Sequence, residues 1–587
     1  LPIMNPGQLK QFLFERIKNA FNRRVEKHEL NYNHISPDML SKVKIKLYKS
    51  ITSSSDTDGD FKENSGQYRL YPRGVRCSKC GDFILLDEKT MRITKNGRCQ
   101  HKLCNGVYRQ ISIVKFCETC GKLDEMYDRC QKHEEHKKSG TPSTIKLRWD
   151  RQDAPVTWRL ECDTCHNPKD ILQIPCNHKD YNSFQISKLK PSKYKPLSIR
   201  SGGVVTPRVV TTVDIPPTKS LDHPKREQLI CAAIAGKLDF LKSKKTADKS
   251  ILEFVDSMYQ SFRSPENKQA VLGVLKQLRP DASDTELEEQ YAQTYNIPLM
   301  EKAIEETSAY LPVKEINMEE ISNFHALKGT FTVETKEKTF SDLVAEKYSK
   351  QDTFKESIDK IRSDYHIKEI TYLSKLKLIS SCIGTINGPT HSDKPDFVAH
   401  FNPLWDSTDR NSLHIYSYPY ETEGLLIEFD KNKLLQWLSS VTGKEYSLTP
   451  EELLLKIKED SDEYKHLYTL LHTLSHVLIK KSSLYTGIDT DSCGEMIFVT
   501  SGAFLIYATN TINIGGFGSV FENSIIDLFT EADLEIRRCI YDPVCLKESG
   551  GCFSCLFLPE HVCCNFNNLL DRDILLGSAR RYKERFW

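Results

Sequence analysis

The spacing of apolar residues along this 587-residue chain changes several times, and each change marks a predicted segment. Near the start, Leu13, Ile17 and Phe21 recur every four residues, which predicts a short helix. A polar stretch at 53–66, rich in Ser, Asp and Gly, predicts a loop. Together these patterns predict a helical leader and loop over 1–66.

Two segments with β-like patterns follow. Short β-like runs such as 106–115 separate pairs of cysteines, which predicts a zinc-ribbon-like, cysteine-rich region over 67–180. The next segment, 181–250, carries fourteen Lys/Arg against five Asp/Glu. Within it, 204–217 holds two β-branched runs punctuated by proline, which predicts strands. We therefore expect a basic linker that contains proline-bearing strands.

Helical spacing dominates 224–380, and we take 251–365 as a helical region. The remaining segment, 366–587, mixes both periods and predicts one C-terminal module. Its predicted elements are short strands over 395–430, a helix over 450–482, strands over 494–510, a turn at Gly515, Gly516 and Gly518, and a further helix. The expected fold class is thus α+β, multidomain, with a helical middle and zinc sites at both ends.

Composition excludes some classes of protein. Hydrophobic residues make up 39% of the chain, which is enough for packed cores and excludes global disorder. The formal net charge is only +2, so any attraction to nucleic acid must be local. No apolar run approaches the roughly 18 residues of a membrane helix, and we find no signal peptide.

Cysteine is the most informative residue type. Seventeen of the nineteen cysteines lie in 77–176 or 493–564, many of them in C-x2-C or C-x4-C spacings. An odd number of clustered cysteines in a large chain without a secretion signal favours metal binding over disulfides, and hence a cytoplasmic protein. We expect two to four structural zinc ions.

The N-terminal region contains three C-x2-C pairs, each with possible partners downstream. A C-x2-C turn places two thiolates on one zinc ion, which takes four ligands in a structural site. The predicted ligand sets are Cys77, Cys80, Cys99 and Cys104, with His101 as a substitute; Cys117, Cys120, Cys130 and His133 or His136; and Cys162, Cys165, Cys176 and His178. The pairing stays open, because Cys117 and Cys120 could instead share a metal with Cys162 and Cys165.

The C-terminal cluster offers six cysteines for one site. The most compact tetrad is Cys545, Cys552, Cys555 and Cys563. We predict that this tetrad binds zinc, with Cys539 as the alternate ligand and Cys564 as a bystander.

No active site is evident from the sequence. His472 and His476 stand one helical turn apart and Glu495 follows, but the sequence lacks the HExxH glutamate that activates water. Their leucine-rich surroundings favour a packed helix face. The three glycines at 515–518 lack the Lys-Ser/Thr of a phosphate loop, and no Walker A string occurs. We predict no catalytic residues, and we expect any ATPase activity to belong to a partner.

Several strings resemble a known family. They are Asp542–Cys545, Gly551–Cys555 and Cys563–Arg572, preceded by His472–His476, Gly494–Glu495 and Gly515–Gly518, and further upstream by Arg73–Cys77, Val205–Val210 and Ile367–Ile383. In this order they resemble the C-terminal zinc-binding module of Mrf-type helicases and the DrmB family, subunits of the bacterial anti-phage system DISARM. The resemblance covers most of the chain and is least well defined over 250–350.

The chain departs from the family pattern at two points. Gly121 follows Cys120 where the family pattern predicts Gly-His, which leaves the second N-terminal ligand set open. Cys564 stands where relatives tend to have another residue, which favours Cys563 as the ligand.

The resemblance implies a non-catalytic subunit that binds the helicase-like subunit DrmA and contacts DNA within that complex. Two alternatives remain: a metal-dependent nuclease centred on His472, His476 and Glu495, and a stand-alone nucleic-acid-binding protein. Tyr194 is a candidate for stacking on a base. The basic candidates for phosphate contact are Arg73, Arg76, Lys188, Lys190, Lys193, Lys195 and Arg200.

Overall fold

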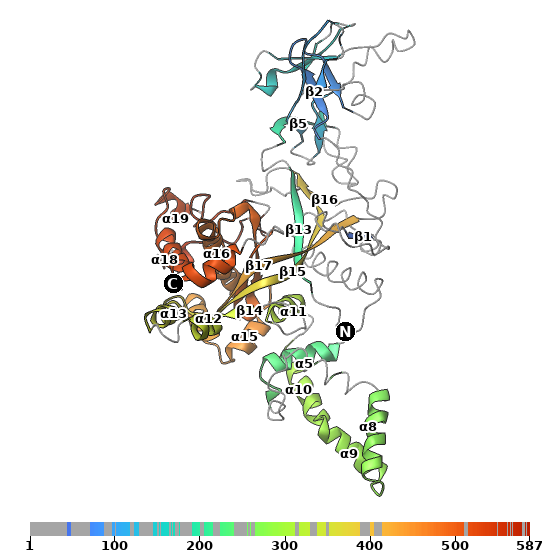
Figure 1. Cartoon of the computed structure of the whole chain (residues 1–587), viewed down its shortest axis with the longest axis vertical. Helices are drawn as coiled ribbons and strands as arrows, with labels where there is room; N and C mark the ends of the chain where they lie inside the picture. Colours follow the sequence, from blue (N-terminus) through green and yellow to red (C-terminus); the bar gives the residue numbers. More distant parts are fainter. Residues whose placement is uncertain are drawn as a thin grey trace. The chain divides into compact units, whose positions relative to one another are not determined.

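The structure is a computed structural model. It describes 44–47, 71–86, 97–127, 145–176, 191–214, 224–239, 255, 259, 265–347, 352–387, 400–403 and 414–587, with internal gaps of at most eight residues. The chain forms two compact units. Unit 1 comprises Leu1–Arg16, Thr211–Ser380 and Pro419–Trp587, and unit 2 comprises Ile17–Val210 and Ser381–Tyr418. Figure 1 traces both units in sequence colours.

The main sheet lies largely in unit 1, although parts of its three longest strands fall within the bounds of unit 2. The main strands are β13 (Val205–Val213), β15 (Ile367–Asn387), β17 (His414–Phe429), β18 (Cys493–Phe498) and β19 (Ala503–Ala508). Their order is β13-β15-β17-β19-β18, and the short strand β14 (Glu337–Thr339) pairs with β15. Strand β19 is buried along its whole length, because β17 and β18 flank it and helices cover it.

The 25-residue helix α16 (Asp462–Thr486) is central to unit 1. The Ser461 side chain accepts a hydrogen bond from the Tyr464 N–H and caps the helix start, and Gly487 ends the helix in the left-handed conformation. Leucines at helical spacing pack into one large core, whose aromatic members include Phe504 and Phe521.

Further helices pack around α16 in unit 1 (Figure 1). They are α14 (Lys431–Thr442), α17 (Gly516–Ser519), α18 (Ile525–Ile536) and α20 (Asp573–Leu576), and α15 (Pro450–Lys456) packs against α14. The other helices of unit 1 are α5 (Pro224–Ile234), α8 (Pro265–Leu278), α9 (Asp284–Thr294), α10 (Ile297–Tyr310), α11 (Met318–Leu327), α12 (Phe340–Lys347), α13 (Asp352–Asp364) and α19 (Val544–Glu548).

Unit 2 is built from small sheets. Their strands are β2 (Gly74–Cys77), β3 (Phe83–Leu85), β4 (Tyr108–Gln110), β5 (Ile113–Phe116), β6 (Leu123–Glu125), β7 (Ile145–Arg148), β8 (Arg159–Cys162), β9 (Pro168–Asp170), β10 (Pro175–Cys176), β11 (Ser192–Lys193) and β12 (Lys195–Ser198). They pair as β3-β2-β4, β12-β5-β6, β7-β8-β9 and β10-β11. A small core that includes Phe83, Leu147 and Trp158 joins two of these sheets.

The α+β, multidomain fold class is confirmed, and the strands predicted within 204–217 are found as the single strand β13 (Val205–Val213). The prediction for 450–482 is right in type but not as one helix, because Ile457–Ser461 separate α15 (Pro450–Lys456) from α16 (Asp462–Thr486). The helical expectation for 224–380 is wrong at its end, because Ile367–Asn387 is one long strand. The three glycines are only partly a turn: Gly515 has a φ of +70°, and Gly516–Ser519 form the short helix α17.

The predicted leader lies outside the described residues except for strand β1 (Lys44–Leu47), which pairs in parallel with β17. The remaining short strand, β16 (His400–Pro403), pairs with β15. Within the described residues, no helix combines the length and apolarity needed to span a membrane.

Candidate metal centres

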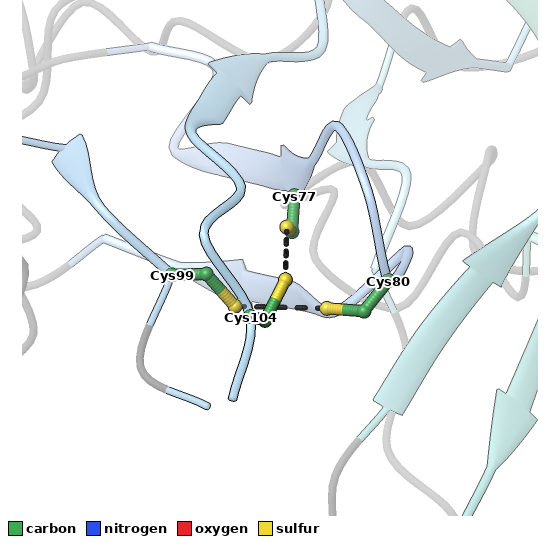
Figure 2. A group of neighbouring side chains, drawn as sticks. All are labelled: Cys77, Cys80, Cys99 and Cys104. Carbon is green, nitrogen blue, oxygen red and sulfur yellow. Dashed lines mark hydrogen bonds between the residues drawn. The ribbon is translucent and has the colours of Figure 1, made fainter. Parts of the chain in front are cut away.

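Four cysteines converge in unit 2. The Sγ atoms of Cys77 and Cys104 lie 3.6 Å apart, as do those of Cys80 and Cys99, and all four lie within 4.8 Å of one another (Figure 2). A Zn–S distance of ~2.3 Å places tetrahedral thiolates ~3.8 Å apart. A disulfide would require ~2.05 Å. The spacing therefore fits zinc, and the structure groups these four cysteines as the sequence predicts.

A tight turn after β2 positions the first pair of thiols. The Cys77 N–H donates to the Asp82 carbonyl at 2.8 Å, and the Gly81 N–H donates back to the Cys77 carbonyl at 3.2 Å. Gly81 has a φ of +77°, a conformation that glycine adopts at little cost. Two residues before strand β4, a Cβ on Gly106 would lie 2.4 Å from the Cys77 sulfur, so only glycine lets this backbone approach the cluster.

The pKa values of the two thiols in this turn are shifted in opposite directions. Burial raises the pKa of Cys77, but hydrogen bonds from the backbone N–H groups of Cys80 and Lys79 outweigh burial and lower it to about 7. Burial raises the pKa of Cys80 to about 12. Metal binding at neutral pH must therefore displace protons from this cluster.

Part of the hydrogen-bond pattern of this turn recurs at Cys117 and Cys162. The Cys117 N–H donates to the Lys122 carbonyl at 2.9 Å, five residues on, as Cys77 does to Asp82. The His166 N–H donates to the Cys162 carbonyl at 2.8 Å, and His166 has a φ of +47° where Gly81 has a φ of +77°. Cys117 and Cys162 thus each make one of the two backbone hydrogen bonds that Cys77 makes.

One contact in the structure lies between two of the predicted ligand sets, whose pairing stays a prediction. The Cys117 sulfur lies 3.1 Å from the Ser192 hydroxyl, and Ser192 faces Cys176 across the β10–β11 pair. Cys117 and Cys176 therefore approach the same serine, a combination that the sequence analysis did not include. The other predicted ligands of these two sets, which are Cys120, Cys130, His133, Cys165 and His178, lie outside the described residues.

The C-terminal cluster of unit 1 contains Cys539, Cys545, Cys552 and Cys555. Their Sγ separations are 3.5 Å for Cys539–Cys552 and 3.6 Å for both Cys545–Cys555 and Cys552–Cys555, again near a zinc tetrahedron. The predicted tetrad therefore needs one correction. Cys539, at the end of helix α18, takes the place assigned to Cys563, because Cys563 turns away toward helix α16.

Two cationic side chains lie beside this cluster. Four thiolates around Zn²⁺ carry a net charge of −2, which favours nearby positive charge. Arg572 is buried, pairs with Asp542 and donates to the Ile536 carbonyl at 3.2 Å. Lys480 of α16 donates to the Phe553 carbonyl at 2.6 Å. Both side chains hold the loop that carries the ligands.

The residues predicted to contact nucleic acid differ in their surroundings. Arg76 donates to the Leu147 carbonyl at 2.8 Å and stacks 3.8 Å from the Trp149 ring centroid, so its guanidinium serves packing within unit 2. Arg73 forms an ion pair with Glu125. The stacking hypothesis for Tyr194 is not supported, because its side chain is buried and donates to Asp124 at 2.8 Å.

Two of the candidate lysines are surface residues. Lys193 and Lys195 are exposed on β11 and β12. Lys188, Lys190 and Arg200 lie outside the described residues.

Comparison with known proteins gives two matches. A family model described only as a domain of unknown function (DUF8724) matches residues 6–192. A protein from Bacillus paralicheniformis named "DISARM protein DrmB" is 27% identical over 267 residues. This chain is similar to a DrmB protein. The alignment covers 42% of this chain and 46% of the relative, so the chain matches less than half of that protein's length.

Proposed function

We propose that this chain is a non-catalytic, zinc-structured subunit of a DISARM-type anti-phage complex, which acts in the bacterial cytoplasm. In this role it binds a helicase-like ATPase, DrmA, and contributes to DNA binding within the complex. The observation that carries the proposal is the similarity to a protein named as a DISARM DrmB. The order of the family-like strings along the sequence also supports it.

The geometry of the cysteine clusters supports a structural role for the metal. Each of the two described four-cysteine clusters offers four ligands, which fills a tetrahedral zinc site and leaves no open position for a substrate. A Cys552→Ser change removes one ligand, and we expect the protein to lose zinc and to unfold at a lower temperature. The matched control is Cys382→Ser, because Cys382 belongs to neither cluster.

Partner binding is the part of the proposal to test first. The tagged chain is co-expressed with a candidate helicase-like ATPase, DrmA, and the two are purified together at several salt concentrations. We expect co-elution of the two chains. Separation at every salt concentration, with both proteins folded, would refute the proposed partnership.

DNA contact is assigned to the exposed Lys193 and Lys195. Reversing both charges with Lys193→Glu and Lys195→Glu should weaken DNA binding by the complex and reduce the slope of log K against log salt by about 2. The matched control reverses two lysines of unit 1, the partly exposed Lys268 of α8 and the exposed Lys302 of α10. Equal losses in both double variants would show that only net charge matters and would contradict this assignment.

The same preparations separate the two alternatives. Strong DNA binding by the chain alone, unchanged by the partner, would favour a stand-alone nucleic-acid-binding protein. Metal-dependent cleavage of DNA by the chain alone, abolished by His476→Ala in a folded protein, would favour the nuclease.

A further inference from the structure

A third group of ligand atoms lies inside unit 1, separate from the cysteine clusters. The Nε2 atom of His472 lies 3.1 Å from Glu495 Oε1 and 3.2 Å from Cys563 Sγ, and the Nε2 atom of His476 lies 3.2 Å from the same Glu495 oxygen. All four ligand atoms fall within 4.8 Å of one another. The side chains of both histidines and of Glu495 are 0% exposed.

The outer nitrogens of both rings are already engaged. His472 Nδ1 lies 3.1 Å from the Leu569 carbonyl, and His476 Nδ1 lies 3.0 Å from the Leu556 carbonyl. A carbonyl oxygen only accepts, so each Nδ1 must carry the hydrogen. In a neutral imidazole the Nε2 then has a bare lone pair. Both Nε2 lone pairs point at Glu495 Oε1, and that of His472 also points at Cys563 Sγ. Hydrogen-bond acceptors therefore face one another with no hydrogen between them.

The other two ligands are oriented in the same way. Cys563 Sγ accepts hydrogen bonds from the Asn565 N–H at 3.3 Å and the Asn567 N–H at 3.2 Å, an environment that stabilises a thiolate. The second oxygen of Glu495 binds the Ser475 hydroxyl, which leaves Oε1 facing the rings. Such outer hydrogen bonds are typical of the groups that orient metal ligands.

A zinc ion resolves the conflict among these acceptors. With Zn–N and Zn–O distances of ~2.0–2.1 Å, tetrahedral nitrogen and oxygen ligands lie ~3.3 Å apart, close to the observed 3.1 and 3.2 Å. One thiolate and one carboxylate also neutralise Zn²⁺, so the centre carries no net charge. A neutral centre suits complete burial, whereas two buried imidazolium ions would be costly.

We propose that His472, His476, Glu495 and Cys563 bind a structural zinc ion, distinct from the four-cysteine site of the same unit. The four ligands come from α16, β18 and the loop after Cys555, so the ion joins three segments that are far apart in sequence. Four protein ligands and full burial give a closed site. The histidines thus serve the fold, which argues against the nuclease alternative without depending on the proposed function.

The two C-terminal sites share one loop. Cys552 and Cys555 belong to the four-cysteine cluster, and the carbonyl of the next residue, Leu556, holds His476. Seven residues later the same segment delivers Cys563. The loop thereby links one site to the other, and α16 contacts it at both ends through Lys480 and His472.

Zinc content tests the proposal. Glu495→Gln keeps the size of the side chain but removes the charge and replaces one acceptor oxygen with an NH2 donor, and Cys563→Ala removes one ligand. In the purified full chain, elemental analysis should show one zinc ion fewer per chain for each variant. The matched controls are Cys493→Ala, a buried cysteine on the same strand as Glu495, and His466→Ala on the same helix as His472. Both controls should keep the wild-type zinc content.

Wild-type zinc content in both folded ligand variants would overturn the proposal. If the variants do not fold, the wild-type protein provides the second measurement. An anomalous difference map collected at the zinc edge from wild-type crystals should show a peak among the two Nε2 atoms, Oε1 and Sγ. Peaks at the four-cysteine clusters with none at this position would equally overturn it.

Discussion

Gly550 allows the C-terminal cysteine loop to pack against Asp571. The Gly550→Ala substitution, which adds one methyl group, tests how closely the loop and Asp571 must approach each other. Gly550 has a φ of +72°, and a Cβ placed on it would lie 2.1 Å from Asp571 Oδ1 and 2.7 Å from Asp571 Cγ. The glycine also donates to the Cys545 carbonyl at 2.9 Å and accepts from the Arg572 N–H at 2.7 Å. Gly550→Ala therefore strains the backbone and drives two segments apart.

The size of the effect follows from these two contributions. A non-glycine residue in the left-handed region costs about 1–2 kcal/mol. Overpacking a tight contact costs about 1–3 kcal/mol more. We expect Gly550→Ala to lower the free energy of unfolding by about 2–5 kcal/mol. Displacing the groups that orient metal ligands should also weaken zinc binding by roughly 10–100-fold.

Gly443→Ala is the matched control. Gly443 ends helix α14 with a φ of +66°, and a Cβ there would meet nothing within 4 Å. Gly443→Ala should therefore lower the free energy of unfolding only by the cost of the left-handed backbone conformation, and its zinc affinity should be unchanged. The assays are thermal unfolding and zinc competition against a chelator of known affinity. Equal destabilisation in both variants, with equal zinc affinity, would refute the idea that the Gly550–Asp571 contact positions the cluster.

Three further predictions concern other parts of the chain. Arg76→Ala should lower the melting temperature, because it removes the stack on Trp149, but should leave DNA binding unchanged; a normal melting temperature with weaker DNA binding would contradict this. The zinc affinity of the N-terminal cluster should rise with pH between about 7 and 9, because the Cys80 thiol, with a pKa of about 12, must release a proton to bind the metal. A zinc affinity that does not change with pH in chelator competition would contradict this. Ser461→Ala should cost about 1 kcal/mol in denaturant unfolding through loss of the α16 cap, and Ser461→Asp should restore it.

Local spacing predicted the parts of the molecule that form within a few residues. The Cys77–Cys80 turn is one example, because the C-x2-C-Gly string sets both the positive φ and the paired thiols. Helix α16 is another, since its leucines follow the helical period for several turns. The fold class follows from such local signals.

Choices that depend on tertiary packing could not be made from sequence. Compact spacing favoured Cys563 over Cys539, yet the end of α18 delivers Cys539 to the cluster, and two histidines of α16 face Cys563. The strand Ile367–Asn387 was also missed in part, because its hydrogen-bonding partners β14 and β16 lie in other segments of the chain. The i, i+4 spacing of His472 and His476 was the available signal for the third site, but the sequence did not identify Cys563 as their neighbour.

The loop that links the two C-terminal sites has a consequence for biosynthesis. Helix α16 emerges from the ribosome about 70 residues before the loop that completes its polar centre, and Phe586 and Trp587 also belong to the core of unit 1. Until those segments are made, the rings of His472 and His476 lack the Leu569 and Leu556 carbonyls and the Cys563 sulfur that they contact in the folded protein. The nascent form of unit 1 should therefore depend on chaperones longer than unit 2, whose Cys77–Cys104 cluster closes within 28 residues.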